Sequence, residues 1–154
     1  MDNNMVNTHG IRIVELPACT MATSSGQSVE AFDRWWSARD KHRRDKFFPR
    51  DFMYHDAQKN ELVWLYALSD EVGDNVPYDT IEFPGGLYAV AVSIDQNDRD
   101  GERVYHAIKN WIVATNQFTL DEQPDRPTLF HVITPDTAFA KMQYRQLDIF
   151  VPVL

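Results

Sequence analysis

The amino-acid sequence predicts one α+β domain with an antiparallel-rich sheet, two long helices on one face of that sheet and a ligand groove on the other. Three observations predict it. The chain has 154 residues, the usual size of one domain. Apolar residues alternate with period two in several short segments and recur with helical spacing in two longer ones. The order strand, helix, strand, strand occurs twice, and no Gly-, Ser- or Pro-rich linker divides the halves.

The first half contains the shorter of the two helical patterns. Pro17 lies within a strand-like run and indicates an edge or a bulge. Ser28 is a suitable N-cap for the helix, which ends before Pro49. The elements expected in this half are a strand over 11–21, a helix beginning at residue 29, and strands over 51–55 and 61–69.

The second half repeats this order. Residues 78–84 lead to Gly85-Gly86, which indicate a turn or bulge before a strand. Asp100 is a suitable N-cap for the helix that follows. The elements expected here are a strand over 87–94, a helix over 101–115, and strands over 128–134 and 144–153.

Composition restricts the partners. The 23 acidic residues outnumber the 15 Lys and Arg, and the net charge of −8 repels phosphate, so we expect no nucleic-acid binding. No apolar run is long enough for a membrane span and no signal peptide is recognisable, so we expect a cytoplasmic protein without membrane association. The segment 39–50 holds six basic residues against two acidic ones. It is typical of a solvated helix end, or else of a docking site for a protein partner.

Metal and nucleophile motifs are missing from the sequence. Cys19 is the single cysteine, which excludes an intrachain disulfide and a multi-cysteine metal site. The five histidines have no metal-ligand spacing, and no Gly-x-Ser-x-Gly motif occurs. We therefore expect no metal, no cofactor and no catalytic residue.

Alternation divides the 61–69 strand into two sets of side chains. Val63, Leu65 and Ala67 form one set, and Trp64 and Tyr66 belong to the other. We expect the aliphatic set to pack under the helices and the aromatic set to face a groove, where aromatic rings stack on flat ligands and attract organic cations. Alternation alone leaves the opposite assignment open for any one strand.

The sequence resembles the GyrI-like superfamily, which includes the effector-binding domains of multidrug-responsive bacterial transcription regulators. The resemblance covers residues 10–154. It is carried by four segments: EFPGGLYAVAVS, GERVYHAIKNWIVATNQF, DRPTLFHV and LDIFVPV. It implies a pair of pseudo-symmetric β-α-β-β units with a groove between the halves for apolar, aromatic and often cationic small molecules. Some members hydrolyse strained electrophilic rings.

One departure from the family pattern affects the groove. Many relatives have a glutamate in the pattern Arg-Pro-x-aliphatic-Glu-x-Tyr, whereas this chain has Phe130 at the acid position and Val132 at the tyrosine position. Another acid must then pair with a cation, and we expect Glu71 first and Glu61 second. The family's regulators also carry a DNA-binding domain. Here only a tail over residues 1–9, which we expect to be flexible, precedes the domain over 10–154.

These observations together predict a stand-alone domain that senses or sequesters a drug-like compound, which is apolar or aromatic and can be cationic. Two alternatives stay open: a hydrolase that detoxifies cyclopropane-type electrophiles, and a regulatory module that binds a protein partner through residues 39–50. The expected ligand-binding residues share an aromatic ring or a carboxylate beside a strand or the first helix: Trp64, Tyr66, Tyr88 and Phe130 as walls, Trp35 at the rim, and Glu71 and Glu61 as charge partners.

Overall fold

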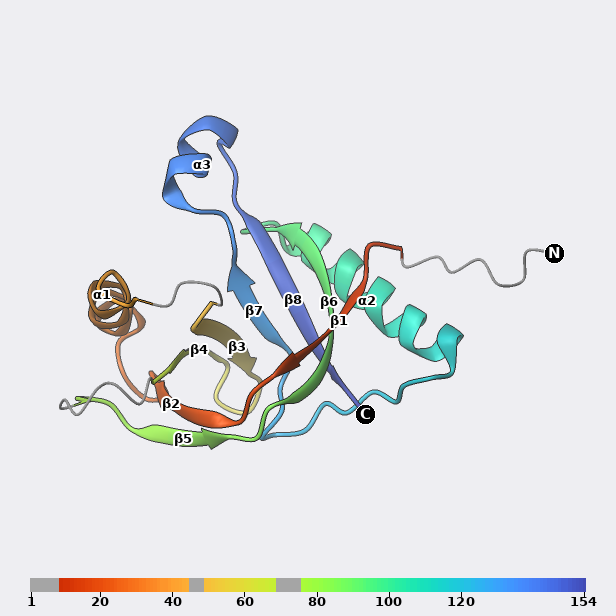
Figure 1. Ribbon diagram of the computed structural model, residues 1–154, viewed down its shortest axis with the longest axis horizontal. Helices are drawn as coiled ribbons and strands as arrows, with labels where there is room; N and C mark the ends of the chain where they lie inside the picture. Colours follow the sequence, from red (N-terminus) through yellow and green to blue (C-terminus); the bar gives the residue numbers. More distant parts are fainter. Residues whose placement is uncertain (1–8, 45–48, 69–75) are drawn as a thin grey trace.

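A computed structural model describes residues 9–44, 49–68 and 76–154. These residues form a curled eight-stranded sheet in the order β1-β6-β8-β7-β3-β4-β2-β5, and every strand pairing is antiparallel (Figure 1). The helices α1 and α2 lie outside the curl. The elements in chain order are β1 (Arg12–Leu16), β2 (Cys19–Thr23), α1 (Val29–Asp40), β3 (Asp51–Asp56), β4 (Glu61–Ala67), β5 (Thr80–Phe83), β6 (Gly86–Ile94), α2 (Asp98–Thr115), β7 (Leu129–Val132), α3 (Asp136–Met142) and β8 (Gln146–Val153).

The strand order is symmetric about its centre. If β1–β4 are relabelled as β5–β8 and β5–β8 as β1–β4, the result is the same strand order read from the opposite edge of the sheet. In this correspondence α1 matches α2. The centre lies between β3 and β7, where Met53 pairs with Phe130. Each half gives its first strand to the other half, because β1 pairs with β6 and β5 pairs with β2. The predicted α+β fold with two pseudo-symmetric halves and helices on one side is confirmed.

The strand exchange explains why the predicted strand over 11–21 is two strands. The chain leaves β1 at Leu16, turns at Pro17, and enters β2 at Cys19 in the other half of the sheet. This corner lies against Gly85, whose φ is +70°. A Cβ at Gly85 would lie 2.5 Å from the Leu16 carbonyl oxygen and 2.6 Å from the Ala18 nitrogen. Only glycine fits where the two crossing segments meet.

Other differences from the predicted elements have local causes. β5 forms where only a lead-in was expected, because its partner β2 comes from the other half of the chain. The short helix α3 was not predicted, since it buries none of its side chains and so has no apolar stripe. Ser28 caps α1 as expected, whereas Asn97 rather than Asp100 caps α2.

The two faces of the sheet are covered differently. On the convex face, Phe32 of α1 packs against β4, and Ile108 of α2 packs against β6 and β8. On the concave face, side chains from both halves form a core of their own, in which Leu65 and Tyr88 are buried. The concave core surrounds a cavity. No helix in the described ranges combines the length and the apolarity that crossing a bilayer requires.

Candidate functional site

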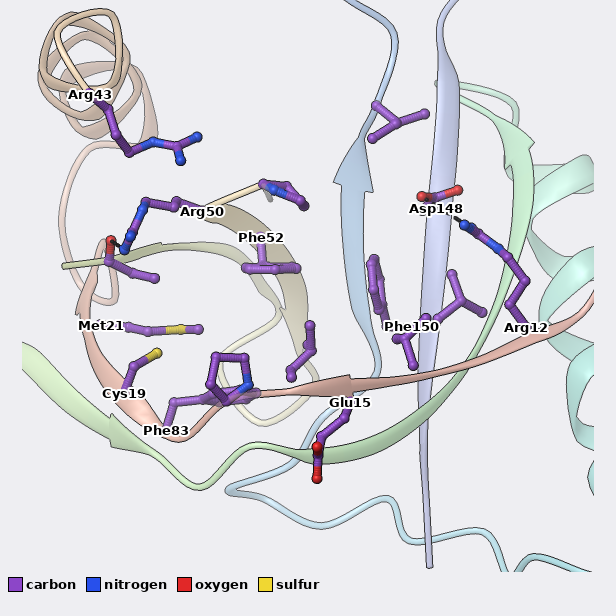
Figure 2. A pocket seen from close by; sticks show the side chains of 17 residues that line it. Arg12, Glu15, Cys19, Met21, Arg43, Arg50, Phe52, Phe83, Asp148 and Phe150 are labelled. Carbon is purple, nitrogen blue, oxygen red and sulfur yellow. Dashed lines mark hydrogen bonds and ion pairs between the residues drawn. The ribbon is translucent and has the colours of Figure 1, made fainter. Parts of the chain in front are cut away.

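A cavity of about 410 Å³ opens on the concave side of the sheet between the two halves (Figure 2). Its walls come from β1 and β2, from the ends of β3 and β4, and from β5, β6 and β8. We call it the central cavity. Most of its surface is made by apolar side chains, among them Val14, Leu16, Met21, Phe52, Phe83 and Phe150.

The strand pattern explains why rings line this space. Phe52 of β3 and Phe150 of β8 both face the concave side, with centroids 5.6 Å apart in an edge-to-face arrangement. Ala67 of β4 and Val90 of β6 also line the cavity. Small side chains at these two positions leave room between the larger rings. The result is an apolar space with aromatic walls.

Charged side chains lie at two ends of the central cavity. At one end, Arg12 of β1 forms an ion pair of 3.4 Å with Asp148 of β8. Asp148 is 8% exposed, whereas Arg12 is exposed to solvent. At the other end lie Arg43, which follows α1, and Arg50, which precedes β3 (Figure 2). Glu15 is exposed and completes the charged lining.

The two arginines at the second end have different partners. Nε of Arg43 donates to Oδ1 of Asp40 at 2.8 Å, which forms an ion pair. Nη1 of Arg50 donates to the carbonyl oxygen of Ala67 at 3.3 Å. Nε of Arg50 is buried and has no hydrogen-bond partner. Arg50 thus holds a charge beside apolar walls with one long hydrogen bond to a neutral acceptor.

Cys19 also lines the central cavity. Burial raises the pKa of its thiol, the nearby Arg50 guanidinium lowers that pKa by a smaller amount, and Glu82 raises it slightly. The net effect is a thiol that stays protonated above its ordinary pKa. Its raised pKa makes Cys19 a weak nucleophile at neutral pH.

The aromatic pair on β4 does not line the central cavity. Trp64 and Tyr66 face α1, where Trp64 lies 5.6 Å from Trp36 and Tyr66 lies 6.0 Å from Trp35, measured between ring centroids. The aliphatic side chains of this strand face the concave core instead. The expected face assignment is therefore reversed in β4. The reason is that α1 presents aromatic residues of its own, and large rings fill the space between a helix and a twisted sheet.

Two other aromatic residues were expected at the site. Tyr88 lies on the concave side as predicted but is fully buried, with its ring 6.3 Å from those of Phe83 and Phe150, which do line the cavity. Phe130 faces the opposite side, where it packs with the α2 core and lines a second, wider hollow with Tyr105. Phe130 was expected in the groove, and its side chain lies on the other face of the sheet.

The predicted charge partners are also placed outside the central cavity or are not described. Glu61 accepts hydrogen bonds from Oγ of Ser25 and from the backbone nitrogen of Gly26, at the turn before α1. Glu71 lies outside the described residues. Trp35 packs with Tyr78 and Phe32 beneath α1. A ligand contact for any of these residues stays a prediction.

The sequence interpretation missed the arginines of the central cavity. Arg43 and Arg50 belong to the basic segment 39–50, which was interpreted as a solvated helix end or a docking site. A signal was present in the strand pattern. Arg50 stands two residues before Phe52, so both side chains lie on the same face of an extended segment. That spacing places a cation beside a ring on the concave side.

Comparisons with known proteins identify the fold. Neither family models nor curated protein sequences give a match. Among solved structures, the chain is similar to EcmrR in an EcmrR–DNA complex, with a TM-score of 0.59 and 15% identity over 93% of this chain and 56% of that chain. It is also similar to a bacterial transcription regulation protein from Staphylococcus aureus MU50, with a TM-score of 0.51 and 12% identity over 93% of this chain and 97% of that chain.

A third structure, SAV2435 bound to tetraphenylphosphonium, aligns with a TM-score of 0.49 and 13% identity over 94% of this chain and 93% of that chain. The chain spans just over half of the EcmrR chain that it matches. At these identities the first two matches concern the fold alone. They agree with the curled sheet and the paired helices, and the chain has the fold that its resemblance to the GyrI-like superfamily implies.

Proposed function

We propose that this chain is a ligand-binding domain that senses or sequesters an apolar or aromatic, drug-like small molecule in the central cavity. One observation carries the proposal: an apolar, ring-lined cavity of about 410 Å³ lies between the two halves. Small-molecule sites are typically clefts of about 300–1,000 Å³ with mostly apolar walls and a few polar groups. The central cavity meets each of these criteria.

The energetics favour a flat apolar ligand. Phe52, Phe83 and Phe150 offer ring surface to the cavity. Each Å² of apolar surface that ligand and protein remove from water contributes about 25 cal/mol. Aromatic pairs add about 0.5–1.5 kcal/mol beyond this term. A fused aromatic compound of two or three rings therefore suits the volume and the walls.

The similar structures suggest a biological role for ligand binding in this domain. Two of the structures that share this fold come from transcription regulators, and one of them is a complex with DNA. We propose that ligand occupancy in this domain regulates transcription. Contact with DNA would then belong to a partner or to a separate domain, because the chain is acidic overall.

Titration with N-phenyl-1-naphthylamine, a neutral fluorescent compound, tests the proposal. We expect saturable binding of one molecule per chain, measured by fluorescence and by calorimetry. Ala67→Phe fills the cavity from β4 and should weaken binding at least tenfold. Trp64→Phe changes the opposite face of the same strand and is the matched control, with affinity unchanged.

Two results would contradict the proposal. Without saturable binding to the wild-type chain, the central cavity is not an apolar ligand site. If Ala67→Phe binds like the wild type while Trp64→Phe loses affinity, the ligand site lies beneath α1, among the aromatic residues that the sequence first indicated.

A further inference from the structure

The charges that line the central cavity are unbalanced. Three arginines, Arg12, Arg43 and Arg50, line it together with two acids, Asp148 and Glu15, and the carboxylate of Glu15 points away from the cavity (Figure 2). Arg12 is paired with Asp148, and Arg43 is paired with Asp40, which is not part of the lining. The third arginine, Arg50, has no ion-pair partner among the described residues.

The apolar surroundings of Arg50 raise the free-energy cost of leaving its charge unpaired. Its neighbours along the cavity wall include Met21, Phe52 and Ala67, and its Nε is buried without a hydrogen-bond partner. A charge held beside apolar walls loses hydration and needs a counter-charge or hydrogen bonds in return. A guanidinium has five N–H donors, and the bond from Nη1 to the Ala67 carbonyl uses one of them. Because Nε itself is buried, the donors left for another acceptor are the other N–H groups of Nη1 and Nη2.

The cavity carboxylates are less suited to hold a cation. Asp148 is engaged by Arg12, and Glu15 is exposed to solvent. A cationic ligand would have to displace the guanidinium of Arg12 or bind where water screens the charge. An anionic group placed at Arg50 meets no such competitor. It would accept two parallel N–H···O bonds, the geometry in which arginine binds carboxylates, sulfonates and phosphates.

The net charge of −8 opposes anions only at long range. At physiological ionic strength the screening length is about 8 Å, so distant surface acids contribute little inside the cavity. A contact with Arg50 is shielded from salt by its apolar walls. Local recognition therefore dominates over the overall charge.

We infer that the central cavity selects ligands with an anionic group on an aromatic body, and that Arg50 anchors this group. Arg50 and Phe52 lie on one side of the same extended segment, so charge and ring are held side by side (Figure 2). This inference rests on the proposed function and specifies its ligand class. It differs from the cationic preference that the family resemblance implies.

A pair of probes isolates the contribution of the charge. 8-Anilino-1-naphthalenesulfonate and N-phenyl-1-naphthylamine share one aromatic frame and differ by a sulfonate. We expect the sulfonate to bind the wild-type chain at least tenfold more tightly, with one site, and each compound to compete with the other. Calorimetry at 150 mM salt measures both affinities.

Variants assign the preference to one residue. Arg50→Met keeps an apolar stem and removes the charge. It should lower the affinity for the sulfonate at least tenfold, to that of the neutral compound, and leave the neutral compound unaffected. Arg34→Met makes the same charge change on the exposed surface of α1 and should leave both affinities unchanged. Arg50→Lys, which keeps a cation, should retain part of the preference. It also serves as the test if Arg50→Met does not fold.

The outcomes separate this inference from the proposed function. If the neutral compound binds the wild type and the sulfonate binds no better, the cavity is a ligand site without anion selectivity and the inference fails alone. A preference that persists in Arg50→Met, or that Arg34→Met also abolishes, overturns the role of Arg50. Tighter binding of crystal violet, a cationic aromatic dye, than of the sulfonate would assign the selectivity to Asp148 instead. If the neutral compound shows no saturable binding, the proposed function itself fails, whatever the sulfonate does.

Discussion

Tyr66 and Arg43 both donate a hydrogen bond to one oxygen atom, Oδ1 of Asp40, at 3.0 Å and 2.8 Å. Tyr66 belongs to the convex face of β4, beneath α1, whereas Arg43 lines the central cavity. The last residue of α1 thus connects the two sides of the sheet. The bond to Asp40 holds Arg43 at the cavity wall. Tyr66, which does not line the cavity, holds Asp40 in place for this bond.

Tyr66→Phe removes one of these two donors. Hydrogen bonds to charged groups contribute about 1.5–3 kcal/mol, so we expect the free energy of unfolding to fall by about that amount. Urea denaturation measures the loss. Tyr54→Phe, whose side chain is partly buried and for which the structure gives no bond to Asp40, should cost clearly less. Equal losses in the two variants would contradict a structural role for the Asp40 contact.

The same tyrosine should control stability at alkaline pH. Burial, and then the nearby carboxylate of Asp40, raise the pKa of Tyr66 to about 12. The unfolded chain releases this proton near its ordinary pKa of about 10, so the unfolded state binds fewer protons than the folded state between these values. The stabilisation is therefore complete below pH 10 and is lost as pH rises toward 12. Tyr66→Phe should reduce the slope of stability against pH in this window, and a spectrophotometric titration should lack one late-ionising tyrosine.

Gly85→Ala tests the corner where the two halves cross. The new Cβ would meet the backbone of Leu16 and Ala18 at a positive φ, so we expect a loss of about 2–5 kcal/mol in the free energy of unfolding. Gly26→Ala is the matched control. Gly26 has a φ of +76° but no atom within 4 Å of the added Cβ, so only backbone strain of about 1–2 kcal/mol applies. Similar losses in both variants would show that the corner can relax.

Arg126 connects the loop before β7 to the ends of β6 and β8. Its Nη1 donates to Asp121 at 2.6 Å, its Nη2 donates to the carbonyl oxygen of Leu87 at 2.7 Å, and its guanidinium lies over the ring of Tyr88. Because the side chain is buried, Arg126→Met should cost about 3–5 kcal/mol, measured by chemical denaturation.

A surface ion pair is the control for Arg126. Arg103 pairs with Asp100 at 2.7 Å, but its side chain is 68% exposed. Arg103→Met should therefore cost at most about 1 kcal/mol. The prediction for Arg126 is refuted if the two substitutions have the same effect.

Cys19 reports occupancy of the central cavity. Because burial raises the pKa of its thiol, we expect slow modification by Ellman's reagent at neutral pH and a rate that is still increasing with pH above pH 9. N-phenyl-1-naphthylamine should slow the modification further in the wild type, but not in Ala67→Phe, where the cavity is filled. Fast modification at pH 7, or protection that Ala67→Phe retains, would place the thiol outside the ligand site.

The sequence predicted the elements that carry strong periodicity and missed those that depend on distant partners. The longer helix, α2, has a clear apolar stripe that includes Val104, Ile108 and Ile112. β5 becomes a strand only through its pairing with β2, and α3 buries nothing. Neither has a local signal that single-sequence reasoning can use.

The candidate site was harder to predict because both faces of its strands are buried. In β4, Val63 and Leu65 face the concave core while Trp64 and Tyr66 pack under α1. When a strand is covered on both sides, alternation no longer distinguishes inside from outside. The sequence therefore identified most of the strands that form the cavity wall, although not β5, and it did not identify the side chains that line the cavity. Arg50 belongs to the segment 39–50, for which the sequence predicts a solvated helix end or a docking site for a protein partner, because a basic run usually lies at the surface.

Because the two halves exchange their first strands, neither half could complete its sheet alone. Either half alone would present an unpaired β2 or β6 edge to water, and exposed edges of that kind recruit other strands. A polypeptide of half this length could complete its sheet only against an identical copy, as a symmetric dimer with its binding chamber on the twofold axis. In the present chain, covalent linkage of the repeats lets the two ends of that chamber differ. Here Arg50 lies at one end of the chamber and Asp148 at the other. In a symmetric dimer both ends would carry the same residues, so the two ends could not differ in charge.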